Sequence, residues 1–325
     1  MTAEGLTAAP LAIARPLSWI VVGAFLAAAL LERRDEDRAR AVAVGAWLLF
    51  GLFWLVLVPH FVLEQKSIVE GIGSILAAPL SVYAGYRLWN GRDSLFVLTR
   101  AVGIMGLIYL PFAYVPFLEA NPARRFLVET VAAQTHFLLN VIGVDPEMVR
   151  GVEYFSRDRG VDYTYRSTFV FPGNARPITY TIIVACTGIG SMAILAGAIL
   201  AVRAPFRRKL RALAVSIPVI YGLNLVRNVF IATAFGQQRM QWFPGLLTSL
   251  FGTTDEQMVS YYIADRLLAQ FGSVIALVAI TWLVVRELPE VVTPIEDLLY
   301  LLTGSEYDLE GALGSSTVRA DGGEE

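Results

Sequence analysis

Long runs of apolar residues, separated by short polar stretches, dominate the chain. A transmembrane helix needs about 20 mostly apolar residues to cross roughly 30 Å of hydrocarbon. Seven runs meet this length, near 12–31, 41–63, 67–88, 98–118, 178–202, 211–235 and 260–285. The pattern therefore predicts an all-α polytopic membrane bundle with about seven transmembrane helices.

The segment 119–177 interrupts this pattern between the fourth and fifth runs. Its part 124–143 has apolar residues at helical spacing together with several charged and polar ones, which is typical of an amphipathic helix lying on a membrane surface. Its part 144–177 is rich in Tyr, Phe, Val and Thr with turn residues, which predicts a small β-like insert. An eighth span over 124–143 stays open.

Arginine-rich loops give the orientation. The three loops near 32–40, 87–100 and 203–211 carry most of the basic residues between spans, and such loops face the cytoplasm. If 124–143 does not span, all three lie on that side, and the N-terminus and the insert lie outside. The expected organisation is a four-span region (1–118), an extracellular insert (119–177), a three-span catalytic region (178–286) and an acidic cytoplasmic tail (287–325).

Composition narrows the class of protein. Hydrophobic residues make up 56% of the chain and charged residues 17%, which excludes an ordinary soluble protein. The formal net charge of -2 gives no support for a nucleic-acid partner. The single cysteine excludes an internal disulfide.

Three ionisable residues inside the last three predicted spans are candidates for a site. Cys186, Arg227 and Arg266 occur in the fifth, sixth and seventh apolar runs, 41 and 39 residues apart. In the expected topology each is about six to eight residues from the outer end of its helix, or roughly 9–12 Å below the outer surface. Ionisable residues at such depth are costly and usually functional. The common depth predicts one site near the outer leaflet.

The residue types suggest nucleophilic chemistry. A thiolate is a strong nucleophile, and a fixed arginine charge can lower its pKa or hold an oxyanion. Supporting polar and small residues flank the three, namely Thr187, Gly188, Ser191, Asn224 and Asn228. Each also fits a structural role, because small residues pack helices and arginines near helix ends reach headgroups. No cofactor and no metal are expected.

A family resemblance adds to this interpretation. The sequences ACTGIGS around Cys186, NLVRN around Arg227 and DR at Arg266 resemble the signature of the exosortase/archaeosortase family of membrane transpeptidases. Arginine in the last place, where many exosortases carry histidine, resembles the archaeosortase branch. The resemblance covers most of the chain.

The resemblance implies both activity and roles. It implies a cysteine transpeptidase of the cell membrane, with Cys186 as nucleophile and Arg227 and Arg266 stabilising the thiolate, the oxyanion or the substrate. Substrates would be C-terminally anchored surface proteins, such as S-layer glycoproteins, with a Pro-Gly-Phe motif, a transmembrane segment and a basic tail. Cleavage through a thioester would be followed by attachment to a membrane lipid. The oligomeric state stays unknown.

The general base and the partners of the two arginines are not evident. The only histidines, His60 and His136, lie outside the matched motifs and receive no catalytic role. Glu70 and Asp265 are candidate negative partners. We expect no direct pairing of Asp265 with Arg266, because neighbours on an ideal helix point about 100° apart.

Three other functions compete with this prediction. A transporter could bind an anionic substrate with Arg227 and Arg266, but no inverted repeat is evident. Another kind of intramembrane protease would need a serine elbow, a zinc motif or an aspartate pair, which the sequence lacks. A structural membrane protein would use the arginines only as headgroup anchors.

Overall fold

The structure is a computed structural model that describes residues 3–65, 68–116, 118, 121–155, 161–172, 176–309 and 311, and the side chains from residue 11 onward within these ranges. Six helical segments in this part of the chain are long and apolar enough to cross a membrane. They are formed by α1 (Ala3–Leu31), α2 (Glu36–Pro59) continued by the π-helical turn η1 (His60–Glu64), α3 (Ile68–Trp89), α4 (Leu95–Ala113), α8 (Phe206–Gly236), and the continuous run of α10 (Met258–Tyr261), η4 (Tyr262–Ala269) and α11 (Gln270–Glu287). The predicted helical polytopic membrane fold is confirmed.

The fifth predicted span is only partly correct. Its first part folds as strand β3 (Ile178–Thr181) and the 3-10 turn η3 (Val184–Thr187), and the helix α7 (Ile189–Ala201) has only 13 residues. At a rise of about 1.5 Å per residue it is shorter than the hydrocarbon core. Hydrophobicity alone did not reveal this, because a buried strand and a buried helix are both continuously apolar.

Helix α7 is buried against its neighbours within the bundle. Most of its residues are buried, from Ile189 to Ala201, as expected for a helix that is apolar on all sides. The close approach of α4 depends on Gly197, because a Cβ there would lie 2.6 Å from the carbonyl oxygen of Ala101.

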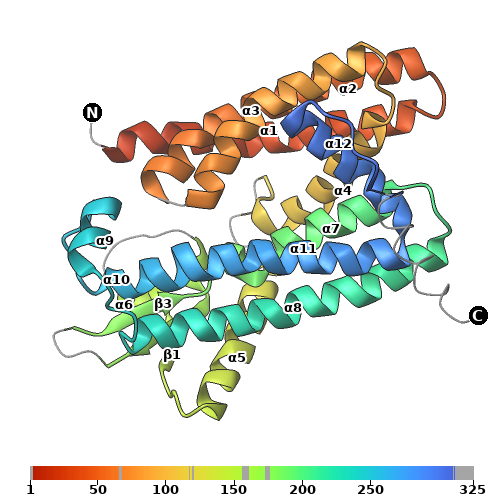
Figure 1. Cartoon of the computed structure of the whole chain (residues 1–325). Helices are drawn as coiled ribbons and strands as arrows, with labels where there is room; N and C mark the ends of the chain where they lie inside the picture. Colours follow the sequence, from red (N-terminus) through yellow and green to blue (C-terminus); the bar gives the residue numbers. More distant parts are fainter. Residues whose placement is uncertain are drawn as a thin grey trace, which may run out of the picture.

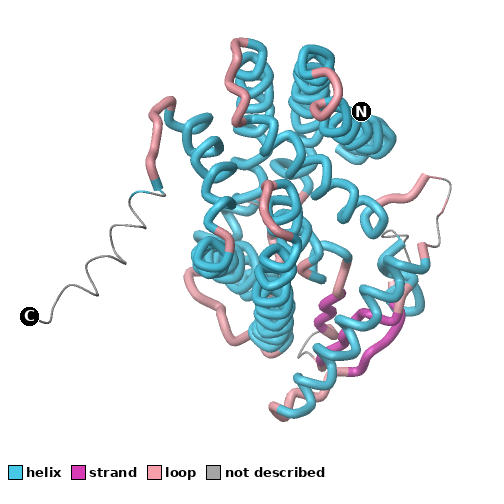
Figure 2. Tube along the Cα trace, turned by 90° about the vertical axis from the view of Figure 1, so that its right-hand side faces the viewer, coloured by secondary structure: helices cyan, strands magenta, loops and turns pink. Residues whose placement is uncertain are grey.

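The insert forms a helix and a small sheet, as predicted. Helix α5 (Pro122–Val141) is not among the helices apolar enough to span, and it exposes Phe126 and Phe137. Strands β1 (Glu147–Arg150), β2 (Arg166–Phe171) and β3 form an antiparallel sheet in the order β1-β2-β3. The strands gather at one margin of the helical bundle (Figure 2). Short elements complete this region and the loops, namely α6 (Gly151–Tyr154), η2 (Val161–Thr164) and α9 (Pro244–Phe251).

Two hydrophobic clusters organise the bundle. One joins α1, α2, α3 and α4 with the C-terminal helix α12 (Val292–Thr303), which follows the short turn η5 (Pro289–Val291). The other joins α5, the sheet, α7, α8 and α11, and includes Phe169 and Ile182 at zero exposure. The sheet is thus part of the same packed core as the helices that carry the candidate site.

The three basic loops meet at one end of the molecule. Glu32 accepts hydrogen bonds from Arg100 and Arg203, while Arg40 binds Asp93. Helix α12 packs at this end as well, and the sheet and α9 lie toward the opposite end (Figure 1). The prediction that these loops share one side of the membrane is therefore consistent with their direct contacts.

Candidate active site

The single cysteine lies on a turn, outside the spanning helices. Cys186 is half-buried in η3, between β3 and the start of α7. Its amide donates to the carbonyl oxygen of Ile183 at 2.8 Å. The predicted position about eight residues inside a transmembrane helix is wrong, because the chain is extended up to Thr181 and the helix begins only at Ile189. A short turn presents the thiol at a helix N-terminus instead.

Gly188 makes the change from the turn to the helix. Its φ of 78° lies in the left-handed region, which glycine adopts at no steric cost. A Cβ at this position would also lie 3.1 Å from the Cβ of Asn224. The glycine thus lets the turn bend sharply while α8 packs directly against it.

Two asparagines of α8 hold the backbone of the cysteine. The Nδ2 atoms of Asn224 and Asn228 each donate to the carbonyl oxygen of Cys186 at 2.8 Å. They are one helical turn apart on α8, so their side chains lie on the same face. Both side chains are buried. This contact fixes the main chain at the nucleophile candidate.

Arg227 lies between these asparagines in sequence and pairs with the next helix. Its Nη2 donates to Oδ1 of Asp265 at 2.6 Å, and Asp265 is 10% exposed in its side chain. Asp265 is therefore the negative partner that a poorly solvated guanidinium requires. Glu70, the other candidate partner, accepts a hydrogen bond from Gln65.

Arg266 also pairs with Asp265, contrary to the prediction. Its Nε lies 3.6 Å from Oδ2 of Asp265. The residues from Tyr262 to Ala269 form a π-helix, whose wider turn changes the 100° spacing on which the prediction rested. The same Nε is buried and has no hydrogen-bond partner among the residues that the structure describes. The guanidinium also lies 5.6 Å from the ring centre of Tyr261.

The hydrophobic pattern gave no reason to select Tyr180 and Tyr261. The Tyr180 hydroxyl donates to Oδ1 of Asn228 at 3.5 Å. Burial raises the pKa of the Cys186 thiol, the cation of Arg227 lowers it, and the nearby carboxylate of Asp265 raises it. Tyr261 lies within electrostatic reach of Asp265, Arg266 and Cys186. Only the fold shows that these aromatic residues line the site.

The remaining residues considered in the sequence analysis make other contacts. The Thr187 hydroxyl donates to the carbonyl oxygen of Val184 at 2.7 Å and so closes the turn. Ser191 is half-buried in the first turn of α7. His60 binds Glu64, and His136 contacts the carbonyl oxygen of Pro146. Among the described residues, no group of three or more His, Cys, Asp or Glu could hold a metal ion.

Comparisons with known proteins match most of the chain. The family model described as transmembrane exosortase matches residues 15–254. A protein named archaeosortase A from Haloferax volcanii is 48% identical over 303 residues, which covers 92% of this chain and 97% of that protein. A second archaeosortase A, from Natronomonas pharaonis, is 40% identical over 289 residues and covers 88% of each chain. No solved structure matches the chain.

The matched regions include the candidate site. Cys186 and Arg227 lie within the family match, whereas Arg266 follows its end by 12 residues. The family match covers well over half of the chain, and both relatives exceed one third identity over nearly their whole length. The chain therefore belongs to the transmembrane exosortase family, whose members are membrane cysteine transpeptidases.

Proposed function

We propose that Cys186 is the nucleophile with which this membrane transpeptidase processes the C-terminal sorting signals of surface proteins. One observation carries the proposal. The only thiol of the chain lies on a turn whose carbonyl is held by two asparagines, and these asparagines flank the arginine that pairs with Asp265. A nucleophile must be held in a fixed position to attack efficiently, and this turn is fixed by α8.

The first step is acyl transfer to sulfur. The Cys186 thiolate attacks the scissile carbonyl carbon, and the carbonyl oxygen becomes an oxyanion. The carbon–nitrogen bond then breaks, the amine leaves with one proton together with the C-terminal segment, and a thioester remains on the enzyme. The amine or hydroxyl of a membrane lipid next attacks the thioester, the carbon–sulfur bond breaks, and the thiolate is restored. The lipid nucleophile gives up one proton in this step, which balances the proton taken by the departing amine.

Arg227 and Arg266 have different surroundings, which suggests different roles. Arg227 acts electrostatically on the thiol and is oriented by Asp265, so its role is to stabilise the thiolate. Arg266 has a buried Nε that lies 3.6 Å from Oδ2 of Asp265 and has no hydrogen-bond partner within the described part of the chain. Buried polar groups are usually satisfied, so this donor suits a substrate carbonyl or the oxyanion. Asn224 and Asn228 then serve as supports of the nucleophile turn, as does Thr187.

The proposed orientation places this site toward the outer side of the cell membrane. The basic loops at the opposite end of the bundle then face the cytoplasm. A substrate anchored by one helix, with its basic tail inside, would present its Pro-Gly-Phe motif at the level of the nucleophile turn. The specific clients, such as S-layer glycoproteins, and the lipid acceptor belong to this proposal.

The test is complementation of a strain that lacks the gene. Wild type, Cys186→Ala, Arg227→Ala and Arg266→Ala are expressed at matched membrane levels. Mass spectrometry then follows the C-terminus of a surface protein that carries a Pro-Gly-Phe signal. We expect each variant to lose processing and the wild type to yield a product with a lipid-sized mass. Normal processing by Cys186→Ala would end the thioester mechanism.

A further inference from the structure

A buried ion pair contacts the start of the nucleophile turn, whose Cys186 carbonyl is held by α8. Arg124, near the start of α5, donates through Nε to Oδ1 of Asp162 at 2.6 Å and through Nη2 to Oδ2 at 2.7 Å. The side chain of Asp162 is 8% exposed and that of Arg124 is 19% exposed. Two parallel charge-assisted hydrogen bonds fix both position and orientation.

The carboxylate of this pair reaches the nucleophile turn. Oδ2 of Asp162 accepts a hydrogen bond from the backbone N–H of Val184 at 3.1 Å. Val184 is the first residue of η3, and Ile183 before it provides no side-chain cap. The first N–H groups of a helical turn have no partner within that turn. Asp162, 22 residues earlier in the chain, supplies the missing acceptor.

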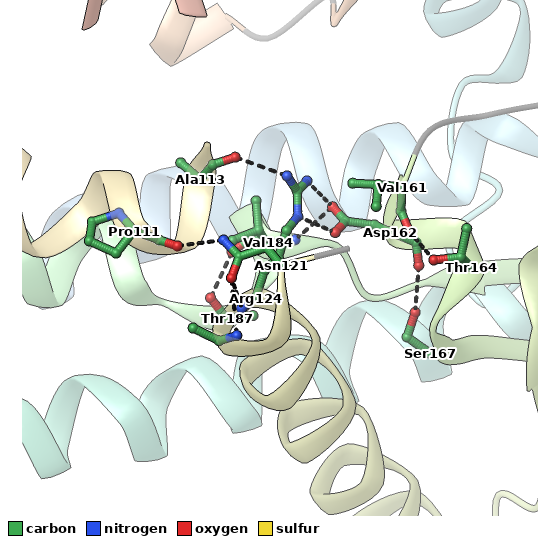
Figure 3. Close-up of polar contacts among 11 residues, drawn as sticks. Pro111, Ala113, Asn121, Arg124, Val161, Asp162, Thr164, Ser167, Val184 and Thr187 are labelled. Atoms are coloured by element: carbon green, nitrogen blue, oxygen red, sulfur yellow. Dashed lines mark hydrogen bonds and ion pairs between the residues drawn. The ribbon is translucent and has the colours of Figure 1, made fainter. Parts of the chain in front are cut away.

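The guanidinium is in turn fixed to the membrane bundle. Arg124 Nη1 donates to the carbonyl oxygen of Ala113 at the end of α4 at 2.9 Å. Asn121 caps α5 by accepting from the backbone N–H of Ala123 and Arg124, and it also donates to the carbonyl oxygen of Pro111. Figure 3 shows this continuous path, with Arg124 between Ala113 and Asp162. The turn is therefore connected to α4 and α5 through one carboxylate.

We infer that Arg124 and Asp162 are positioning residues that hold the Cys186 turn for the reaction. Cys186 is fixed at its carbonyl by Asn224 and Asn228, and the start of its turn is fixed by Asp162. Neither Arg124 nor Asp162 acts on the substrate; they act through Val184. This inference rests on the proposed nucleophilic role of Cys186.

The experiment uses the full-length protein in membranes and compares Arg124→Ala, Asp162→Ala and Asp162→Asn with wild type. Asparagine keeps an oxygen that can accept the Val184 N–H, so it should retain more activity than alanine. The matched control is Arg92→Ala, because Arg92 likewise binds a buried carboxylate, Asp297, which is 2% exposed in its side chain. That pair joins the loop before α4 to α12, in the other hydrophobic cluster.

Four quantities are measured for each variant. They are kcat and KM for a substrate with a Pro-Gly-Phe signal, the rate at which N-ethylmaleimide alkylates the protein, and the thermal midpoint. Because Cys186 is the only cysteine, alkylation reports on this turn independently of activity. A displaced nucleophile should lower kcat by about tenfold to a hundredfold and leave KM within about twofold. Alkylation should become severalfold faster because the loosened turn admits the reagent.

The outcomes separate the two proposals. For Arg92→Ala we expect a similar loss of thermal midpoint with unchanged kcat and alkylation. The positioning role would be overturned if Asp162→Ala kept the wild-type kcat or if a variant with reduced kcat showed unchanged alkylation. An equal loss of kcat in Arg92→Ala would overturn it as well. If Cys186→Ala still processes the substrate, the nucleophile proposal itself fails. If Cys186→Ala is inactive while Asp162→Ala is fully active, only the positioning role fails.

Discussion

At the scale of single residues, the reactivity of the thiol depends on two opposing effects. Burial and the nearby carboxylate of Asp265 raise the pKa of Cys186 and so favour the neutral thiol, whereas the guanidinium of Arg227 favours the thiolate. Only the thiolate attacks a carbonyl or an alkylating reagent. The pH dependence of alkylation therefore measures the balance of these effects directly.

Arg227→Ala should move the alkylation of Cys186 to higher pH. Loss of the cation raises the pKa of the thiol further, so the thiolate fraction near neutral pH falls and alkylation slows. The rate of iodoacetamide incorporation is followed by intact mass over a pH series. Arg286→Ala is the control, because Arg286 lies over Trp282 near the far end of α11. An unshifted profile in Arg227→Ala would contradict the electrostatic role.

The two asparagines should show a coupled effect. Each donates to the same carbonyl oxygen of Cys186, so one remains when the other is removed. Loss of one neutral hydrogen bond costs about 1 kcal/mol, or roughly a fivefold fall in rate if it is expressed in the transition state. The Asn224→Ala/Asn228→Ala double variant should lose more than the product of the two single effects.

Processing rates at matched membrane levels test this coupling. The control is Asn90→Ala, because Asn90 also donates its amide to a backbone carbonyl, that of Tyr86, but at the end of the bundle with the basic loops. Independent, purely multiplicative effects of the two site variants would argue against their joint hold on Cys186.

At the scale of elements, the short helix α7 shows what hydrophobicity alone cannot predict. The run 178–202 is apolar throughout, and that property fits a spanning helix as well as a buried strand followed by a short helix. The residues that separate the two are Thr179, Tyr180 and Thr181, which pair with β2. This pairing is with the adjoining strand β2, which lies before the run, so the run itself carries no signal of it. The division of the chain into four regions, with boundaries at residues 119, 178 and 287, stays a prediction.

The packing of α7 on α4 should depend on Gly197. Gly197→Ala places a Cβ at 2.6 Å from a backbone oxygen, and such overpacking costs about 1–3 kcal/mol. Gly190→Ala in the same helix is the control, since a Cβ there meets no atom of the described residues within 4 Å. Thermal unfolding in detergent measures both. Equal midpoints for the two variants would exclude a tight contact between α7 and α4.

At the scale of the whole molecule, the basic loops and the candidate active site lie toward opposite ends of the bundle. The ion pairs Arg40–Asp93 and Arg203–Glu32 tie the basic loops together at one end. The sheet, whose strand β3 leads into the turn with Cys186, and α9 lie toward the other (Figure 1). A cytoplasmic position of the basic end therefore implies an outward-facing site, which suits proteins that are processed after export.

Labelling of introduced cysteines should reveal this orientation. In a Cys186→Ala background, Gln241→Cys before α9 should react with a membrane-impermeant maleimide on intact cells. Arg207→Cys at the start of α8 should react only after lysis. Both positions are exposed in the structure, so access depends on the side of the membrane. The reverse pattern would place the site inside and contradict the proposed topology.

The sequence by itself determined the membrane class, most of the spans, the common side of the basic loops and the three residues that suggested a site. These follow from local properties, since a spanning helix satisfies its own backbone and needs only a long apolar run. The tertiary structure decided the rest. It decided the turn that bears Cys186, the pairing of Arg227 and Arg266 with Asp265, and the Arg124–Asp162 link to Val184. Each of these features joins residues distant in the chain or depends on a local departure from ideal helix geometry. Periodicity cannot encode such contacts, because they arise only when the elements pack together.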